Sequence, residues 1–409
     1  MTTLRMGIAT ALAAVACTAA PATQAANPAF QNFFFTVCQN PTAALAARCG
    51  ETAAGQGNLS GDSESSLNPS QALSNNQSPL SLAHSRGEQV REYSAASREE
   101  DRSLEASKFG LLFVGRGAWD DQNRTVDVDA ERGFSSDAQA FDFGFESRVS
   151  ERVAIGLLAT YEAISGEFVP ERPGANFAPV GNAGDVDVRS WGLAAYLNAQ
   201  LGEGGFLDLA AGYVDSQFEL ERRAVFQESG RVVPQTNVAT TADADGQQLW
   251  ATANAGFDWS NGAWTWGLYA SALWAESAQD PYDERDVSGS GLAMHFAVAD
   301  RQSLLGTAGA RASRAIKTSF GVVVPQLRVD YVREFELDGQ DATASFLLDA
   351  QRSTFTFAGD EPDDSYGVAA LGIAAILPRG WMPYLSVDAI VGGDDLDRYR
   401  VALGLRREL

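Results

Sequence analysis

Residues 264–274 read WTWGLYASALW, and this stretch decides the fold class because its apolar side chains recur at every second position. Successive residues of a β-strand point to opposite faces, so one face would carry only tryptophan, leucine and alanine. Trp264 and Trp266 at one end and Trp274 at the other are separated by roughly the ~25 Å height of the apolar band on a membrane β-barrel. The stretch therefore predicts a strand that crosses a membrane and carries aromatic residues at both ends. The opposite face would carry Thr265, Gly267, Tyr269 and Ser271.

The same period of two continues along the rest of the chain, from Lys108 to Leu409. Most of the strands that it predicts exceed the ~5–6 residues usual in soluble sheets and reach the ~9–11 residues that cross a membrane when tilted. Their number is even, which suits a closed antiparallel outer-membrane barrel. The twelve predicted strands span approximately 109–119, 137–149, 152–167, 184–200, 204–220, 245–260, 263–277, 302–316, 319–336, 364–377, 381–392 and 397–409.

The connections between these strands are short on one side and mostly long on the other, as in barrels with periplasmic turns and extracellular loops. Trp259 and Trp381 would join Trp264 and Trp266 in an aromatic girdle on the short-turn side, with Trp274 opposite. A soluble β-sandwich also alternates, but it would bury its tryptophans in the middle of strands. We therefore predict an all-β fold: a 12-stranded antiparallel transmembrane β-barrel of the outer membrane, preceded by a helix that threads the lumen or serves as a linker. The predicted long connections are 120–136, 168–183, 221–244, 278–301 and 337–363.

Charge and hydropathy exclude other classes of protein. The 409 residues include 53 Asp and Glu against 30 Lys and Arg, which gives a formal net charge of -23. Nucleic-acid binding needs basic patches, so the acid excess argues against a nucleic-acid partner. After the N-terminus no apolar run approaches the ~20 residues that a membrane helix requires, which argues against a helical membrane protein.

The N-terminal region divides into three parts. Residues 1–25 have the pattern of a secretory signal peptide, with a basic start, an apolar stretch and a small-residue cleavage site. Export would make a disulfide between Cys38 and Cys49 the simplest state of these two cysteines. Residues 26–78, rich in Asn, Gln, Ser and Gly, are predicted to be a short and largely irregular segment. Residues 79–107 are charged and alanine-rich, which favours a helix in polar surroundings.

Three segments in the C-terminal three quarters of the chain carry a resemblance to a known family. They are VVVPQLRVDYVREFE (322–336), PYLSVDAIVG (383–392) and YRVALGLRREL (399–409). In their order and position they resemble the C-terminal β-barrel domain of autotransporters, the type V secretion family. The resemblance covers residues 108–409 and implies a protein of the Gram-negative outer membrane with a very short passenger.

The resemblance also implies partners and a C-terminal insertion signal. The partners would be outer-membrane lipid, the barrel insertion machinery and periplasmic chaperones, and a barrel closed by one chain would be a monomer. The chain ends in Leu409, whereas the family usually ends in an aromatic residue that the insertion machinery reads. The residues of the insertion signal are Tyr399, Val401, Leu403, Leu405 and Leu409.

By the same resemblance, residues 80–107 would form a helix inside the barrel lumen, and a periplasmic linker helix is the alternative. Its charged residues would pair with luminal charges, which keeps buried charges satisfied. On the helix these are Glu88, Arg91, Glu92, Arg98, Glu99 and Arg102, and on the barrel Arg189, Asp208, Asp258, Arg328 and Asp330.

Little in the sequence points to catalysis. Gly61-Asp62-Ser63 is similar to the nucleophile block of lipolytic autotransporters, but the segment is too short for a hydrolase scaffold. Asn75-Asn76 is similar to the pair at which some autotransporters cleave themselves, although its flanks differ. His295 lies among acidic residues in a long connection, where outer-membrane hydrolases place such groups. We expect no catalytic, cofactor-binding or metal-binding residues, because a solvated surface explains His295 and the acidic loops.

Three functions remain in competition. The first is an autotransporter-like barrel that inserts in the membrane and displays or translocates its own N-terminal segment. The second is a non-secreting pore, scaffold or adhesin that acts through its long loops. The third is a hydrolase at the rim of the barrel, centred on His295.

Overall fold

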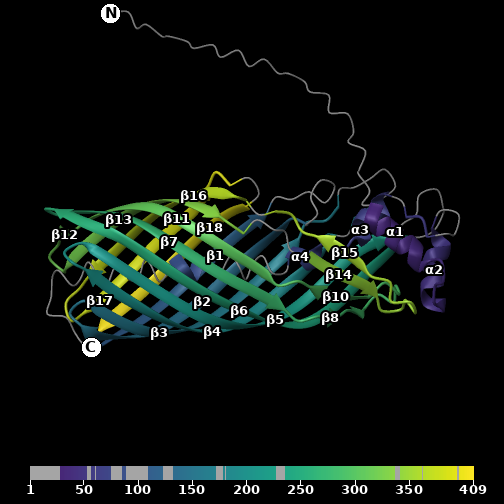
Figure 1. Cartoon of the computed structure of the whole chain (residues 1–409), viewed down its shortest axis with the longest axis horizontal. Coiled ribbons are helices and arrows are strands. Elements are labelled where there is room, and N and C mark those ends of the chain that lie inside the picture. The colour runs from purple at the N-terminus through teal and green to yellow at the C-terminus, as the bar shows by residue number, and fades with distance from the viewer. Residues whose placement is uncertain are drawn as a thin grey trace, which may run out of the picture.

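The computed structural model describes residues 28–52, 57–59, 61–74, 85–88, 109–122, 132–171, 178–179, 181–226, 235–336, 341–361, 363–393 and 396–409. Within these ranges the chain forms short helices followed by an antiparallel β-barrel, with the helices at one end of the barrel and the C-terminus at the other (Figure 1). The proposed signal peptide lies outside the described residues. None of the described helices is long and apolar enough to cross a membrane.

Twelve strands close the barrel, as the sequence predicts. Each strand pairs with its neighbours along the chain, and the first strand pairs with the last from Gly110↔Glu408 to Gln122↔Leu396. The strands are β1 (Phe109–Gln122), β2 (Phe134–Ser150), β3 (Val153–Phe168), β4 (Gly184–Leu201), β5 (Gly205–Phe226), β6 (Thr236–Asn261), β7 (Trp264–Gln279), β11 (Arg301–Arg314), β13 (Val322–Glu334), β16 (Ser365–Ile376), β17 (Trp381–Val391) and β18 (Leu396–Glu408).

Pro325 lies within β13 and interrupts one of its ladders. The pairing of β11 with β13 stops at Ser313↔Gln326, and the two-residue strand β12 (Ile316–Lys317) resumes it in the same register at Ile316↔Val323. Proline has no N–H to donate, so a gap at this point is expected. The other ladder of β13, with β16, runs through Pro325↔Ile373.

Two of the predicted boundaries are wrong. The connection expected at 221–244 is mostly strand, because β5 has 22 residues and β6 has 26. Both strands exceed the ~9–11 residues needed to cross a membrane and rise above the rest of the barrel wall. Residues 26–78, expected to be largely irregular, contain four helices: α1 (Pro28–Val37), α2 (Ala43–Glu51), α3 (Gly61–Leu67) and α4 (Gln71–Ser74).

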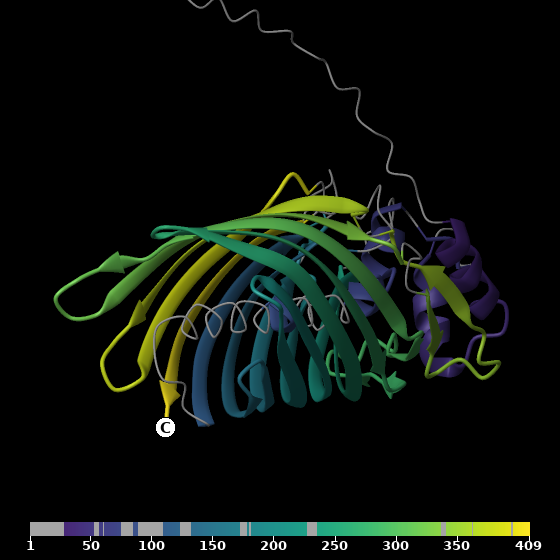
Figure 2. The ribbon, with the colours of Figure 1, turned by 60° about the vertical axis from the view of Figure 1, so that its left-hand side comes forward.

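Two other predicted long connections also fold. They contribute a second sheet of four short strands in the order β15-β14-β10-β8. These strands are β8 (Tyr282–Asp283), β10 (Met294–Val298), β14 (Asp341–Phe346) and β15 (Phe355–Ala358), while β9 (Arg285–Asp286) pairs with β6. Helices α1 and α4 contact this sheet and α3 packs on β5, so the helices lie at the end of the barrel away from the C-terminus (Figure 2).

Side chains on the barrel wall alternate between exposed and buried along each strand. On β2, Phe141, Phe143 and Phe145 face outward, while Asp142 and Glu146 face the lumen. An apolar outer face and a polar inner face are typical of a barrel that spans a membrane. The buried apolar core therefore lies mainly between the helices, the second sheet and the mouth of the barrel.

Candidate functional site

The candidate site is the barrel lumen, and five of its residues form a polar clamp. The clamp consists of Arg86, Arg116, Asp142, Glu162 and Gln248. Arg86 donates Nε–H to Glu162 Oε1 at 2.9 Å and also hydrogen-bonds Gln248, while Arg116 donates to Asp142 at 2.9 Å and to Glu162 at 3.3 Å. Every buried charge in the clamp thus faces an opposite charge, as burial of ions requires.

Residues 85–88 belong to the N-terminal part of the chain, yet they lie inside the barrel. Ser85 accepts a hydrogen bond from Arg116 at 2.9 Å, and Glu88 pairs with Arg328 at 3.7 Å and with Arg400. Gly87 lies so close to the wall that a Cβ there would stand 2.8 Å from Leu273 Cδ1. These four residues therefore touch the lumen on several sides, and their pairing confirms Glu88 and Arg328 as luminal partners.

Apolar side chains form a collar inside the lumen. It includes Leu112, Leu158, Tyr196, Trp250 and Leu273, all buried. Two of its aromatic rings lie flat against a glycine directly opposite on the next strand, in the pairs Gly156↔Tyr196 and Gly212↔Trp250. A side chain at either glycine would push the ring into the lumen, so glycine lets the ring lie against the barrel wall.

The inner face of β18 carries three arginines, each with a carboxylate partner on β1, β2 or β17. Arg398 bonds Asp120 of β1 at 2.8 Å, and Arg400 bonds Asp388 of β17 at 2.8 Å. Arg406 crosses over β1 and reaches Glu146 of β2 at 2.7 Å. The last strand is therefore fixed to both neighbours by ion pairs as well as by its ladders.

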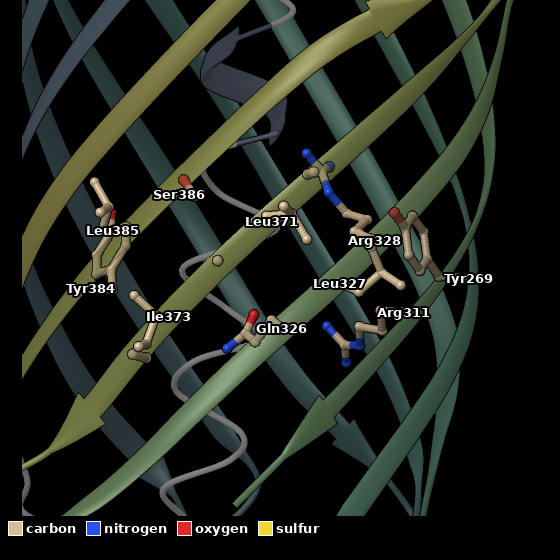
Figure 3. Close-up of a pocket in the computed structure, with 13 residues that line it drawn as sticks. Tyr269, Arg311, Gln326, Leu327, Arg328, Leu371, Ile373, Tyr384, Leu385 and Ser386 are labelled. Atoms are coloured by element: carbon tan, nitrogen blue, oxygen red, sulfur yellow. The ribbon is translucent and has the colours of Figure 1, made fainter. Parts of the chain in front are cut away.

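A pocket lies in the barrel wall between β11, β13, β16 and β17, lined by luminal side chains and by the outward Leu327, Leu371, Ile373 and Leu385 (Figure 3). Arg311 and Arg328 line it, beside Gln326, Tyr384 and Ser386. Arg311 already bonds Asp258 at 3.1 Å, and Arg328 bonds Asp330 at 3.0 Å. Because both guanidinium groups are paired, the pocket does not have the character of an anion-binding site.

The predicted luminal charges are thus only partly right. Asp208 faces inward and accepts a hydrogen bond from Asn254 at 2.9 Å, and Asp258 and Asp330 also face inward. Arg189 is wrong as a luminal residue: its side chain is 58% exposed on the outer face of β4, where it pairs with Glu219. The other predicted helix charges, Arg91, Glu92, Arg98, Glu99 and Arg102, lie outside the described residues.

The five predicted girdle tryptophans all lie on the outer face of the barrel. Trp259, Trp264 and Trp266 are exposed beside the turn between β6 and β7, where the rings of Trp264 and Trp266 stack at 5.7 Å. Trp381 is half-buried under the guanidinium of Arg407, and Trp274 is half-buried near the other end of β7. Their role at the membrane surface stays a prediction.

The sequence predicts only Trp274 on the side of the long connections, and the structure adds a second aromatic girdle there. Its members point outward, and on several strands the next outward residue toward the long connections is charged: Arg189 beyond Trp191 on β4, and Asp215 beyond Tyr213 on β5. An aromatic residue followed by a charged one is typical of the level where lipid meets water. This signal was present in the sequence. The members are Trp119, Tyr161, Trp191, Tyr213, Tyr331 and Tyr399.

The residues of the predicted insertion signal form the outer face of β18 and the C-terminus. Tyr399, Leu403 and Leu409 are exposed, and Val401 and Leu405 are half-buried. The backbone N–H of Leu409 donates to Phe109 O at 3.0 Å, which ties the C-terminus to the start of β1.

The structure joins Cys38 and Cys49 by a disulfide between α1 and α2. The two residues are 11 positions apart and lie on the helices at the mouth of the barrel. Cys49 is buried, and the bond holds these two short helices together.

The residues weighed for catalysis do not form a pocketed site. His295 Nδ1 lies 2.6 Å from Asp283 Oδ1, but their side chains are 45% and 66% exposed. Ser63 is buried in α3, and Asn75-Asn76 lies outside the described residues. No group of three or more metal-ligating side chains occurs among the residues that the structure describes.

Fold and lumen together define a class of protein: a membrane β-barrel with a polar interior that holds part of its own N-terminal chain. The family model of the autotransporter beta-domain matches residues 113–388, so the chain belongs to the autotransporter beta-domain family. Members of this family are outer-membrane proteins of Gram-negative bacteria. No curated protein sequence matches the chain.

Solved structures of autotransporters are similar to this chain. The translocator domain of the autotransporter NalP from Neisseria meningitidis superposes with a TM-score of 0.58 at 12% identity, covering 81% of this chain and 98% of that one. The beta domain of the Bordetella autotransporter BrkA has a TM-score of 0.46 at 14% identity, covering 73% and 99%. The transport unit of AIDA-I from Escherichia coli has a TM-score of 0.46 at 11% identity, covering 75% and 92%.

Proposed function

We propose that this outer-membrane barrel carries its own N-terminal segment through its lumen and displays that segment on the cell surface. One observation carries the proposal: three consecutive parts of the chain lie at successive levels of the barrel. Helices α1–α4 lie at the end with the long connections, residues 85–88 lie in the lumen, and β1 begins at the end with the short turns. Short turns face the periplasm in outer-membrane barrels, so the helices would face outward.

The contacts inside the barrel support a lumen that is occupied in the finished protein. Arg86 pairs with Glu162 of β3, and Glu88 pairs with Arg328 of β13 on the opposite side of the wall. Removing these residues would take one partner from Glu162, Arg328 and Arg400, and breaking a buried ion pair costs about 3–5 kcal/mol. A periplasmic linker would have no need of such contacts, and a non-secreting pore would need an open lumen.

The remaining features of the proposal follow from the family and the fold. The chain would be exported by residues 1–25, held by periplasmic chaperones and inserted by the barrel insertion machinery through the outer face of β18. One chain closes the barrel, so the protein would act as a monomer in contact with outer-membrane lipid. It would not be an enzyme, since the side chains of His295 and Asp283, the pair weighed for catalysis, are largely exposed.

Surface labelling of intact cells tests the proposal. An epitope tag inserted at Asn58 lies on the helical segment at an exposed position. We expect an antibody to label the tag without permeabilisation of the outer membrane. Labelling that appears only after permeabilisation, with the barrel shown to be inserted, would favour a barrel that secretes nothing and acts through its loops.

The same labelling experiment has a matched control on the barrel itself. A tag in the turn at Gly262, between β6 and β7, lies at the short-turn end. It should be labelled only in permeabilised cells. Labelling of both tags in intact cells would mean that the outer membrane is leaky. Labelling of the Gly262 tag alone would mean that the barrel has the opposite orientation, which would overturn the proposal.

A further inference from the structure

Resting on the proposed function, we propose that residues 28–74 form a resident cap that stays docked on the extracellular loops and is neither a free-standing nor a released passenger. The cap consists of α1–α4 and the described residues between them. Its docking surface is the sheet β15-β14-β10-β8 and the raised ends of β5 and β6. The cap would remain bound even when its covalent connection to the barrel is cut.

The first argument is a shared aromatic core. Phe33 of α1 stacks on Phe346 of β14 and Phe355 of β15, with ring centroids 5.4 and 5.6 Å apart. Phe34 lies 5.9 Å from Phe346 and 6.3 Å from Phe226 at the end of β5. Aromatic residues dominate the energetics of cores and interfaces, so these contacts join cap and loops into one folded unit.

The second argument is that polar groups of the cap also bind the loops and the strand ends. Thr42 donates to Leu348 O at 2.7 Å, and Gln71 donates to Ala183 O at 3.0 Å. Ser66 accepts a hydrogen bond from the backbone N–H of Val225 at 2.7 Å. Gln71 and Ser66 are buried, and a hydrogen bond of this kind contributes about 0.5–1.5 kcal/mol net, so each bond opposes undocking.

The third argument concerns what undocking would expose. One face of the second sheet carries Met294, Phe296, Phe346, Phe355 and Phe357, all buried in the complete chain. An apolar patch of this kind is rarely left open to water on a soluble surface. The loops are therefore stabilised by the cap, and the cap by the loops. A passenger destined for release would not be expected to leave such an apolar surface behind.

A cleavage experiment tests the cap. The chain carries an epitope tag at Asn58 and the recognition site of a sequence-specific protease between Gln77 and Ser78, which separates the cap from the luminal residues. Both Cys38 and Cys49 lie before the cut, so the disulfide does not tether the fragment. The purified protein is cut in detergent and passed over a size-exclusion column. We expect nearly all of the tagged fragment to elute with the barrel, and elution as a free fragment would overturn the proposal.

Two substitutions in neighbouring residues provide the matched controls. Phe34→Asp places a charge in the shared core, whereas Phe35→Asp changes an exposed side chain of the same helix. We expect Phe34→Asp to release most of the cut fragment and Phe35→Asp to retain it. Both variants should keep the heat-modifiable migration of a folded barrel. Equal retention in both variants would overturn the shared core as the cause of docking.

The same cut in intact cells separates this proposal from the proposed function. Cleavage in intact cells, with the fragment retained on the cells, supports both. Cleavage with the fragment in the medium overturns the resident cap but leaves surface display standing. Cleavage only after permeabilisation, with co-elution in detergent, overturns surface display while the docked complex remains.

Discussion

The guanidinium of Arg86 bonds the carboxylate of Glu162 inside the barrel, with Nε and Oε1 2.9 Å apart, although the two residues belong to different parts of the molecule. Glu162 is fully buried and also faces Arg116 at 3.3 Å. One carboxylate thus balances a charge from the N-terminal chain and a charge from the barrel wall. This ion pair therefore links the barrel wall directly to the N-terminal residues inside the lumen.

This relationship predicts a large effect of removing Glu162. Glu162→Ala should lower the free energy of unfolding by about 3–5 kcal/mol, because it leaves two buried guanidinium groups with less compensation. Urea unfolding in detergent, followed by tryptophan fluorescence, measures the change. Arg189→Ala is the control: it breaks an exposed pair with Glu219 and should cost about 1 kcal/mol or less. Similar losses in the two variants would contradict a buried clamp.

The strands of the barrel could be predicted from the sequence, but the extramembrane structure could not. Along β5, Tyr213 and the outward residues before it are mostly apolar, so period-two alternation identifies a membrane strand. Beyond Asp215 the outward side chains are polar, and the apolar ones, such as Phe218 and Phe226, point inward to the cap. In β5 the apolar face therefore changes from the outer to the inner side partway along the strand. A prediction that requires one constant apolar face places the end of the strand too early.

The cap could not be predicted from the sequence for a different reason. The cluster Phe33-Phe34-Phe35 was visible in the sequence, but its partners Phe346 and Phe355 lie more than three hundred residues further along. Each of β10, β14 and β15 has only four to six residues, so each resembles a loop when considered alone. Only contacts that are distant in sequence make these pieces regular. Gly404 of the last strand also depends on such a contact, because the ring of Tyr384 opposite fills the space that a side chain would need.

The position of a residue relative to the membrane predicts how much an added charge at that residue destabilises the barrel. Ala253 lies exposed on the outer face of β6 between Gln247, which is above the apolar band, and Trp259 at its lower edge. Ala253→Arg should reduce the free energy of folding into lipid vesicles by about 2–4 kcal/mol, and Gln247→Arg by about 0–1 kcal/mol. Folding titrations in urea measure both values. Equal costs at the two positions would contradict the membrane boundary between Gln247 and Ala253.

The loop between β9 and β10 should lose stability in acid. Burial raises the pKa of the Asp286 carboxyl group, but hydrogen bonds from the backbone N–H groups of Gly291 (2.6 Å) and Ser290 (3.0 Å) outweigh it, so the pKa lies below its ordinary value. A depressed folded pKa contributes stability above the unfolded pKa of about 3.9, and that contribution disappears as the pH falls through the folded pKa.

Asp286→Asn isolates this contribution from that of other carboxylates. The difference in unfolding free energy between the native chain and the variant should be constant from about pH 7 to pH 5 and should shrink below about pH 4. Thermal unfolding in detergent at a series of pH values measures it. A difference that is the same at pH 7 and pH 2 would mean that the charge of Asp286 does not stabilise the loop.

The disulfide should stabilise the cap and leave the barrel unchanged. Cys38 and Cys49 are separated by 11 residues, and closing a loop of this size stabilises a fold by about 2–4 kcal/mol. Cys38→Ser with Cys49→Ser should therefore make residues 28–74 more sensitive to protease, since both cysteines lie on α1 and α2 or next to them. Heat-modifiable migration should stay normal, because no barrel strand contains either residue. Reductant should reproduce the effect in the native chain and have none in the variant; a change in barrel migration instead would mean that the bond acts on barrel assembly.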